Sequence, residues 1–282
     1  MSKSVKRWLI TGCSTGFGRA LALEALARGD QVAVTARKAA AVADIAAANP
    51  AHALALPLDV TDARQVAEAA AATQARFGGV DILVNNAGYA FIGGVEETDP
   101  DEYRALFDTN LFGALAMMQA VLPIMRRQRS GRILNVSSMA SYGPGPGMGL
   151  YGATKAALAA VSESLAAETV PMGIKITVIE PGSHSTEAMR QMIGSRRRIE
   201  DYAETTGKYR GLMAGIVGNQ VGDPVLAARA MIAVADSDAP PMRLPLGQDA
   251  LTRAQTTYAR RAAETEAWKE LSISSVPPEA RR

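Results

Sequence analysis

The feature that most constrains this chain is a regular alternation of short apolar segments with longer helical segments between residues 6 and 182. The apolar segments are short and end at turn signals, and the segment at 31–35 is rich in β-branched residues, which predicts buried strands. They lie at residues 8–10, 31–35, 53–58, 81–85, 131–137 and 174–179, with a shorter strand expected at 242–244. Strands that alternate with helices form a parallel sheet covered on both faces.

The segments between the strands carry helical patterns and end at glycine or proline. We expect helices at residues 18–28, 38–48, 62–77, 99–129, 151–169, 224–234 and 250–271. Right-handed crossovers turn such an order into a Rossmann-type, doubly wound α/β sheet, here in a single domain. The ligand site of such a sheet lies beyond the carboxyl ends of its strands.

Composition excludes several other classes of protein. The 30 basic and 28 acidic residues nearly balance, so we expect no nucleic-acid partner. No apolar stretch approaches the ~18 residues of a membrane helix, so we expect no membrane span. One cysteine and two histidines predict no metal site and, by default, a cytoplasmic protein. The dense basic run Arg196–Arg198 is interpreted as a solvated loop.

A glycine-rich turn follows the first strand, where Gly12, Gly16 and Gly18 stand in the spacing G-x-x-x-G-x-G. Glycines allow a tight turn from strand to helix and let a pyrophosphate approach the backbone. The start of the helix then offers free N–H groups and the positive end of its dipole. We therefore expect a dinucleotide here, and Cys13 is interpreted as a small residue that fills a small space.

The end of the second strand points to the type of dinucleotide. A carboxylate there binds the ribose hydroxyls of NAD, whereas an arginine accommodates the 2′-phosphate of NADP. Here the strand runs into Arg37 and Lys38, and Asp30 precedes it. The sequence therefore predicts NADP(H), with NAD(H) as the alternative. Asp59, after the third strand, is expected either to accept from the adenine amino group or to begin the next helix.

Tyr151 and Lys155 stand four residues apart at the start of a predicted helix, which places them on one face. An ammonium near a phenol favours the phenolate, so we expect the pKa of Tyr151 to be lowered toward neutral pH. Ser138 ends the fifth strand, and Asn85-Asn86-Ala87-Gly88 ends the fourth. Because these strand ends meet at one edge of the sheet, we expect the hydroxyl, the phenol and the ammonium to share a site.

These motifs together resemble the short-chain dehydrogenase/reductase family in its compact subtype. Its motifs match Thr11-Gly-x-x-x-Gly-x-Gly18, Asn85 to Gly88, Asn110, Ser138, Tyr151-x-x-x-Lys155 and Pro181-Gly182. Trp8 to Gly12, Gly16 to Arg19 and Thr35 to Arg37 further resemble a branch related to 17β-hydroxysteroid dehydrogenases.

The resemblance implies that Tyr151 exchanges a proton with the substrate oxygen and that Ser138 orients that oxygen. Lys155 would lower the pKa of the tyrosine and bind the nicotinamide ribose, and Asn110 would support a water that relays protons. Together with the preceding arguments it gives the expected cofactor contacts. These are Gly12, Ser14, Thr15, Gly16, Phe17, Gly18, Arg37, Asp59, Val60, Asn86, Ala87, Gly88, Tyr151, Lys155, Pro181, Gly182 and Thr186.

We expect residues 1–247 to form the cofactor-binding and catalytic domain, and residues 248–282 a helical extension. Residues 183–222 would form a substrate loop within the domain. Its apolar residues, if they do not simply pack on the domain, favour a bulky apolar ketone, aldehyde or alcohol as substrate. They are Met189, Met192, Ile193, Tyr202, Tyr209, Leu212 and Met213. Arg190 and Arg196–Arg198 leave an anionic substrate open.

Two further functions stay open: an epimerase or dehydratase that uses bound nicotinamide transiently, and an NADP-sensing regulator without catalysis. His184 is interpreted as a residue at the loop surface, with a substrate contact as the alternative. The family resemblance also implies a homodimer or homotetramer.

Overall fold

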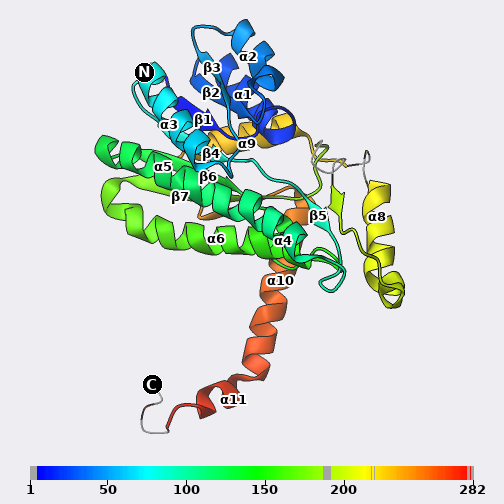
Figure 1. The fold of residues 1–282 in the computed structure, drawn as a ribbon. Helices are drawn as coiled ribbons and strands as arrows, with labels where there is room; N and C mark the ends of the chain where they lie inside the picture. Colours follow the sequence, from blue (N-terminus) through cyan, green and yellow to red (C-terminus); the bar gives the residue numbers. More distant parts are fainter. Residues whose placement is uncertain (1–4, 187–191, 217, 219, 278–279, 281–282) are drawn as a thin grey trace.

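The computed structural model describes residues 5–186, 192–216, 218, 220–277 and 280. Within them, a seven-stranded parallel sheet has the order β3-β2-β1-β4-β6-β7-β9 (Figure 1). Its strands are β1 (Arg7–Ile10), β2 (Gln31–Ala36), β3 (Ala53–Pro57), β4 (Ile82–Asn85), β6 (Gly131–Val136), β7 (Ile174–Pro181) and β9 (Arg243–Leu246). The expected Rossmann-type sheet is confirmed.

Helices cover both faces of this sheet because both faces are apolar (Figure 1). One layer contains α1 (Gly16–Ala27), α2 (Ala43–Ala48) and α9 (Pro224–Asp236). The other contains α3 (Ala63–Phe77), α5 (Gly113–Gln128) and α6 (Gly149–Thr169). Local signals set the helix ends: the carboxylate of Asp62 accepts from the N–H groups of Arg64 and Gln65, and Gly78 ends α3 with φ +81°.

The strand order reverses at the centre of the sheet, where β1 pairs with β2 on one side and β4 on the other. Trp8 is the register partner of Val32 in β2 and of Ile82 in β4. The connections after β1 and β4 therefore leave toward opposite faces and open a crevice at the carboxyl edge.

The helix expected over 99–129 is divided. It consists of α4 (Pro100–Phe107), a π-helical turn η2 (Asp108–Phe112) and α5. Among the described residues, Pro100–Gln128 is a helical run long and apolar enough to cross a membrane by length and composition. In the fold it is a core helix, because Met117, Met118 and Val121 of α5 are buried against the sheet.

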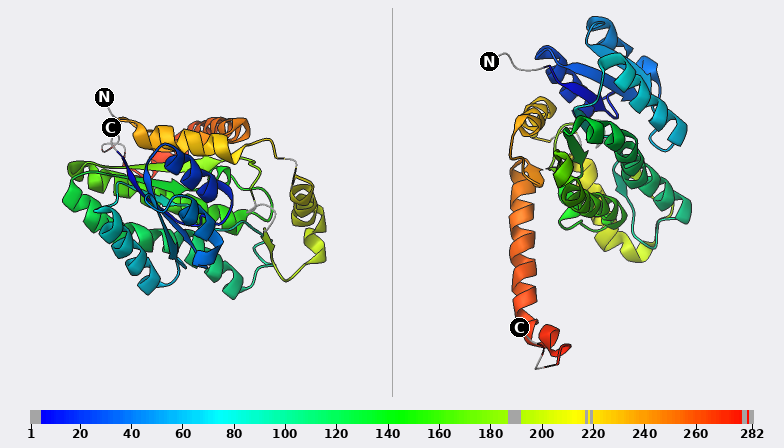
Figure 2. Two further views of the ribbon diagram at one scale, coloured as in Figure 1. Left: turned by 90° about the horizontal axis from the view of Figure 1, so that it is seen from above. Right: turned by 90° about the vertical axis from the view of Figure 1, so that its left-hand side faces the viewer.

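Two further elements lie outside the regular alternation. A small parallel pair joins β5 (Phe91–Ile92) to β8 (Ile193–Gly194) and brings part of the expected substrate loop beside the segment after β4. After β9, α10 (Gln248–Ala267) and α11 (Lys269–Ser274) leave the body of the molecule as a projecting arm (Figure 2). The single helix expected over 250–271 is thus two helices that meet at Trp268.

Candidate active site

A cleft of about 450 Å³ opens at the carboxyl ends of β1, β2, β4, β6 and β7. Seventeen of the nineteen expected site residues line it, all but Gly18 and Asn110. They are Gly12, Ser14, Thr15, Gly16, Phe17, Arg37, Asp59, Val60, Asn86, Ala87, Gly88, Ser138, Tyr151, Lys155, Pro181, Gly182 and Thr186. The motifs that lie far apart in the sequence therefore come together in one crevice, whereas the role of each residue stays a prediction.

The glycine turn forms one wall of this cleft. Gly12 has φ +72°, which favours glycine, and a Cβ on Gly18 would lie 2.4 Å from the carbonyl oxygen of Gly12. The side chain of Asn86 fixes the turn by donating to the carbonyl oxygens of Thr11 and Gly12 at 2.9 and 3.0 Å. Asn86 thus joins the end of β4 to the turn after β1.

The start of α1 is open to the cleft. Its N-cap residue, Thr15, makes no side-chain capping hydrogen bond, and the first turn of the helix carries no acidic residue. Unpaired N–H groups and the positive end of the helix dipole suit an anionic group. The turn and the helix start therefore fit a dinucleotide pyrophosphate.

Arg37 is exposed at the end of the cleft that lies immediately after β2. Asp30 is buried at the other end of β2, where its carboxylate accepts from Trp8 Nε1 at 2.9 Å. It therefore takes no part in the cleft. Asp59 lines the cleft, but one of its carboxylate oxygens accepts from the N–H and the hydroxyl of Thr61.

Tyr151 and Lys155 lie on the first turns of α6, and Ser138 lies just beyond β6. The Lys155 ammonium is 5.8 Å from the centre of the Tyr151 ring and donates to the carbonyl oxygen of Val136 at 2.9 Å. Burial lowers the pKa of Lys155 to about 8. An ammonium with this pKa exchanges its proton within the physiological range.

The expected direction of the Tyr151 pKa is wrong for the protein alone. Burial raises the pKa of Tyr151, and a hydrogen bond with the Ser138 side chain offsets part of this effect. Loss of water around the phenol is the larger of the two effects. The phenol is therefore protonated at neutral pH, the form that can donate to a carbonyl oxygen.

Asn110 is buried in the π-helical turn η2 behind the cleft. Its side chain accepts from the N–H of Tyr89 and donates to the carbonyl oxygen of Tyr89, both at 3.0 Å. The side-chain amide is thus occupied by the segment after β4. A Cβ on Gly88 would lie 2.8 Å from Asn110 Oδ1 and 3.5 Å from Lys155 Nζ, which puts both groups beside that glycine.

His184 is buried rather than at the loop surface, which corrects the first interpretation. Its ring packs edge-on against Phe17 with centroids 5.1 Å apart, and its Nδ1 is 3.2 Å from the carbonyl oxygen of Gly182. The loop folds inward here because the backbone of His184 pairs with Gly222 at the other end of the loop. Cys13 is also buried, and burial raises the pKa of its thiol to about 12, as suits a small filler.

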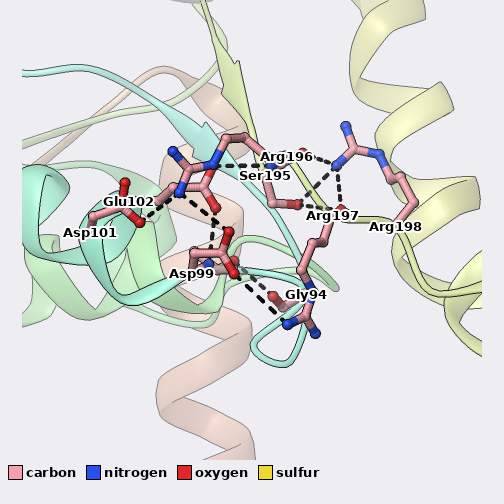
Figure 3. A network of polar contacts seen from close by, with 9 residues as sticks. Gly94, Asp99, Asp101, Glu102, Ser195, Arg196, Arg197 and Arg198 are labelled. Carbon is pink, nitrogen blue, oxygen red and sulfur yellow. Dashed lines mark hydrogen bonds and ion pairs between the residues drawn. The ribbon is translucent and has the colours of Figure 1, made fainter.

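The basic run Arg196–Arg198 is exposed, as expected for a solvated loop, and its side chains are also paired, as Figure 3 shows. Arg196 forms ion pairs with Asp99 at 3.2 Å and Asp101 at 2.6 Å, at the start of α4. Arg197 lies 3.8 Å from Asp99, and Arg198 donates to the backbone and hydroxyl of Ser195. The contacts of Arg196 and Arg197 fasten the loop to the start of α4.

The loop also has a small apolar core. Ile92, Met148 and Met213 are buried together, with Tyr151, Met192, Tyr209 and Ile216 packed against them. Leu212 is exposed, and Met189 and Arg190 lie outside the described residues. Some of the expected lining thus packs on the domain beside the catalytic tyrosine candidate.

Sequence reasoning missed several residues that line the cleft. They are Ala36, Leu58, Thr61, Tyr89, Ala90, Thr109, Val136 and Ser137. Tyr89 directly follows the motif that ends at Gly88, so its position in the sequence could have predicted that it lines the cleft. Ile193 and His184, which the sequence offered as possible substrate contacts, also line the cleft, and the β5–β8 pair brings Ile193 there.

Comparison with known proteins agrees with this geometry. The family model for the short chain dehydrogenase matches residues 6–196. The chain belongs to the short-chain dehydrogenase/reductase family. Relatives of this family include enzymes named as oxidoreductases, and this chain is a short-chain oxidoreductase.

A relative from Botryotinia fuckeliana, "Oxidoreductase BOA17", is 37% identical over 96% of this chain and 99% of its own. A solved short-chain dehydrogenase from Streptomyces avermitilis is 41% identical, with a TM-score of 0.90 over 97% of this chain and all of that one. The structure "ElxO with NADP Bound" is 28% identical, with a TM-score of 0.73 over 88% of this chain and all of its own. None of these names specifies the 17β-hydroxysteroid dehydrogenase branch, which stays a prediction.

Proposed function

We propose that this short-chain oxidoreductase uses NADP(H) to interconvert a ketone or aldehyde with an alcohol. The observation that carries the proposal is one cleft with Tyr151, Ser138 and Lys155 at one end and Arg37 at the other. When bound, the dinucleotide supplies or accepts the hydride, while the protein supplies the proton and the orientation.

In reduction, the protonated hydroxyl of Tyr151 donates its proton to the carbonyl oxygen, and in oxidation the phenolate takes the proton back. The Ser138 hydroxyl holds the same oxygen by a hydrogen bond. Lys155, held by the carbonyl oxygen of Val136, places a positive charge beside the phenolate that forms. Its pKa of about 8 lets it return a proton to the tyrosine at neutral pH.

The preference for NADP(H) rests on Arg37. The guanidinium can bind a 2′-phosphate through two parallel hydrogen bonds, and Lys38 adds a second positive charge. No acid follows β2 at its carboxyl end, and Asp30, at the other end, is buried against Trp8. The similar structure ElxO holds NADP, in line with this proposal.

The substrate side of the cleft favours an apolar carbonyl compound. Ile193 and Ala90 line it, and the methionine-containing core of the loop lies directly behind Tyr151. An anionic substrate is the weaker alternative, because Arg196 and Arg197 already face carboxylates of α4 and its N-cap. Transient use of nicotinamide by an epimerase or dehydratase, or cofactor sensing without catalysis, would give no net consumption of NADPH.

The test is a panel of carbonyl compounds, from small polar aldehydes to bulky apolar ketones, with NADPH or NADH and absorbance at the nicotinamide band. We expect net NADPH consumption, greatest with the bulky apolar ketones. Arg37→Ala should raise the KM for NADPH by about 10- to 100-fold, the value of a charged hydrogen-bonded pair, and leave that for NADH unchanged. Preference for NADH in both proteins would contradict the cofactor assignment.

The cytoplasmic location and the dimer or tetramer that the resemblance implies stay predictions. So does the division into a domain at 1–247 and an extension at 248–282.

A further inference from the structure

The C-terminal arm has two halves with different surroundings. In the half from 248 to 261, Ala250, Ala254 and Thr257 are buried, and Tyr258 packs edge-on against Tyr142. Arg261 donates to the carbonyl oxygen of Tyr142 at 2.9 Å. Every residue from 258 to 277 is exposed, and beyond 261 the arm projects away from the sheet (Figures 1 and 2).

The projecting half, which we call the arm tip (262–277), carries large apolar side chains in water. Trp268 is 64% exposed, Leu271 is 63% exposed and Ile273 is 38% exposed. The six-residue helix α11 is too short to be stable alone in water, since isolated helices need ~12–15 residues. Exposed apolar side chains and a helix too short to be stable alone are both typical of a segment that a partner surface covers.

Charge is divided between the two halves of the arm. Residues 248–261 hold three arginines against one aspartate, and residues 262–277 hold three glutamates against one lysine. The base is therefore positive and the tip negative. Two arms laid antiparallel place the base of each against the tip of the other, so their charges are complementary.

A groove of about 840 Å³ runs along the base of the arm. Thr252, Thr256 and Arg260 line it from one face of α10, opposite Pro144 and the 96% exposed Val221. Trp268 lies twelve residues beyond Thr256, or roughly 18 Å along an unbroken helix, so the tip cannot fold back into its own groove. The arm tip of a second copy, however, can reach this groove.

We propose that two copies of this chain pair through their arms, antiparallel about a two-fold axis, with each tip in the other copy's groove. A centre near Ala262 sets Thr256 opposite the partner's Trp268. Arg260, which pairs with Glu264 of its own chain at 2.8 Å, then also faces the partner's Glu264. The small residues Ala259, Ala262 and Ala263 flank that centre and let the helices approach closely. Such an interface is isologous, as a closed dimer requires. Because His184 lines both the groove and the catalytic cleft, the partner's tip lies beside the active site.

Fluorescence of the intact protein reports this pairing directly. The chain has two tryptophans: Trp8 is buried in the sheet, and Trp268 is on the arm. As concentration rises from nanomolar to about 100 µM, we expect quenching of Trp268 by acrylamide to fall several-fold and its emission to shift to shorter wavelength. Trp268→Phe gives the constant signal of Trp8. Leu271→Asp should abolish the change, whereas Leu226→Asp, at a 61% exposed site on α9, should not.

A disulfide test fixes the antiparallel register. In Thr256→Cys with Trp268→Cys, the two thiols of one chain are too far apart for a bond, whose Cα atoms lie about 4.4–6.8 Å apart. We expect oxidation to give a covalent dimer, and Leu226→Cys with Trp268→Cys to give far less. Concentration-independent quenching of Trp268, or a double-cysteine variant that stays monomeric on oxidation, overturns the proposal. A dimer that forms while Trp268 remains fully quenchable, through some other face, overturns it as well.

Discussion

The glycine turn and the substrate loop form two sides of one cleft, but different contacts hold them. Gly18 fits against the Gly12 carbonyl with no room for a Cβ, and Asn86 fastens the turn from within. Arg196, which fastens the loop, is 58% exposed, and its partner Asp101 is 68% exposed. Close backbone packing defines one geometry, whereas exposed ion pairs contribute little and weaken in salt. The glycine turn is therefore expected to be rigid and the part of the loop around Arg196 adjustable, whereas further along the loop Arg210 pairs with the buried Glu97 at 2.9 Å.

The largest effect, on the affinity for NADPH, is expected for a substitution in the glycine turn. In Gly18→Ala the new Cβ meets backbone at 2.4 Å, so the turn must shift and lose its fit to the pyrophosphate. Strain of about 3 kcal/mol would lower the affinity for NADPH by more than about 100-fold, measured by fluorescence titration. Gly211→Ala is the matched control, because a Cβ there meets nothing within 4 Å. Equal affinity in both variants would show that the turn is not rigid.

A smaller effect concerns the buried ammonium of Lys155. Its pKa falls from 10.5 in the unfolded chain to about 8 in the fold, so burial of the charge opposes folding below pH 8. That cost, at most about 3 kcal/mol, disappears as pH rises from 8 to 10.5. In urea unfolding without cofactor, Lys155→Met should be more stable than the wild type at pH 7 by about 2 kcal/mol, after loss of the bond to Val136. The difference should shrink toward pH 10, and a constant difference would contradict the charge as its cause.

The smallest effect is expected for a substitution at Arg196 in the loop. Arg196→Ala removes exposed ion pairs, so the free energy of unfolding should fall by less than about 1 kcal/mol. Substrate KM should rise a few-fold with kcat nearly unchanged, and 0.5 M salt should give the wild type a similar KM. A large fall in kcat with unchanged KM would mean that the loop orders the catalytic groups themselves.

The sheet and the glycine turn could be predicted from the sequence, whereas parts of the loop region and the turn at Asn110 could not. The sheet, its order reversal and the position of the cleft follow from apolar strands and glycine turns, which are local signals. The β5–β8 pair has two residues per strand and joins positions about a hundred residues apart. Strands this short show no hydrophobic periodicity in the sequence that could predict them. The π-helical turn at Asn110 likewise interrupts a pattern that reads as one continuous helix.

Within the site, residue types were predictable but electrostatics were not. Spacing alone places Tyr151 and Lys155 on one face, yet the direction of the tyrosine pKa depends on how completely the fold removes water from the phenol. Similarly, the acids that face Arg196 come from a helix start about a hundred residues earlier. His184 is buried where the two ends of the loop pair at Gly222 and where its ring packs against Phe17, contacts between residues far apart in the sequence.

The central claim is that the hydroxyl of Tyr151 supplies the proton in a cleft that binds NADP(H). The most direct test measures turnover and NADPH affinity together in Tyr151→Phe, which keeps the ring and removes the hydroxyl. We expect kcat to fall by at least about 1,000-fold, with the NADPH dissociation constant within about 3-fold of the wild type. Turnover at the wild-type rate in this variant would contradict the account.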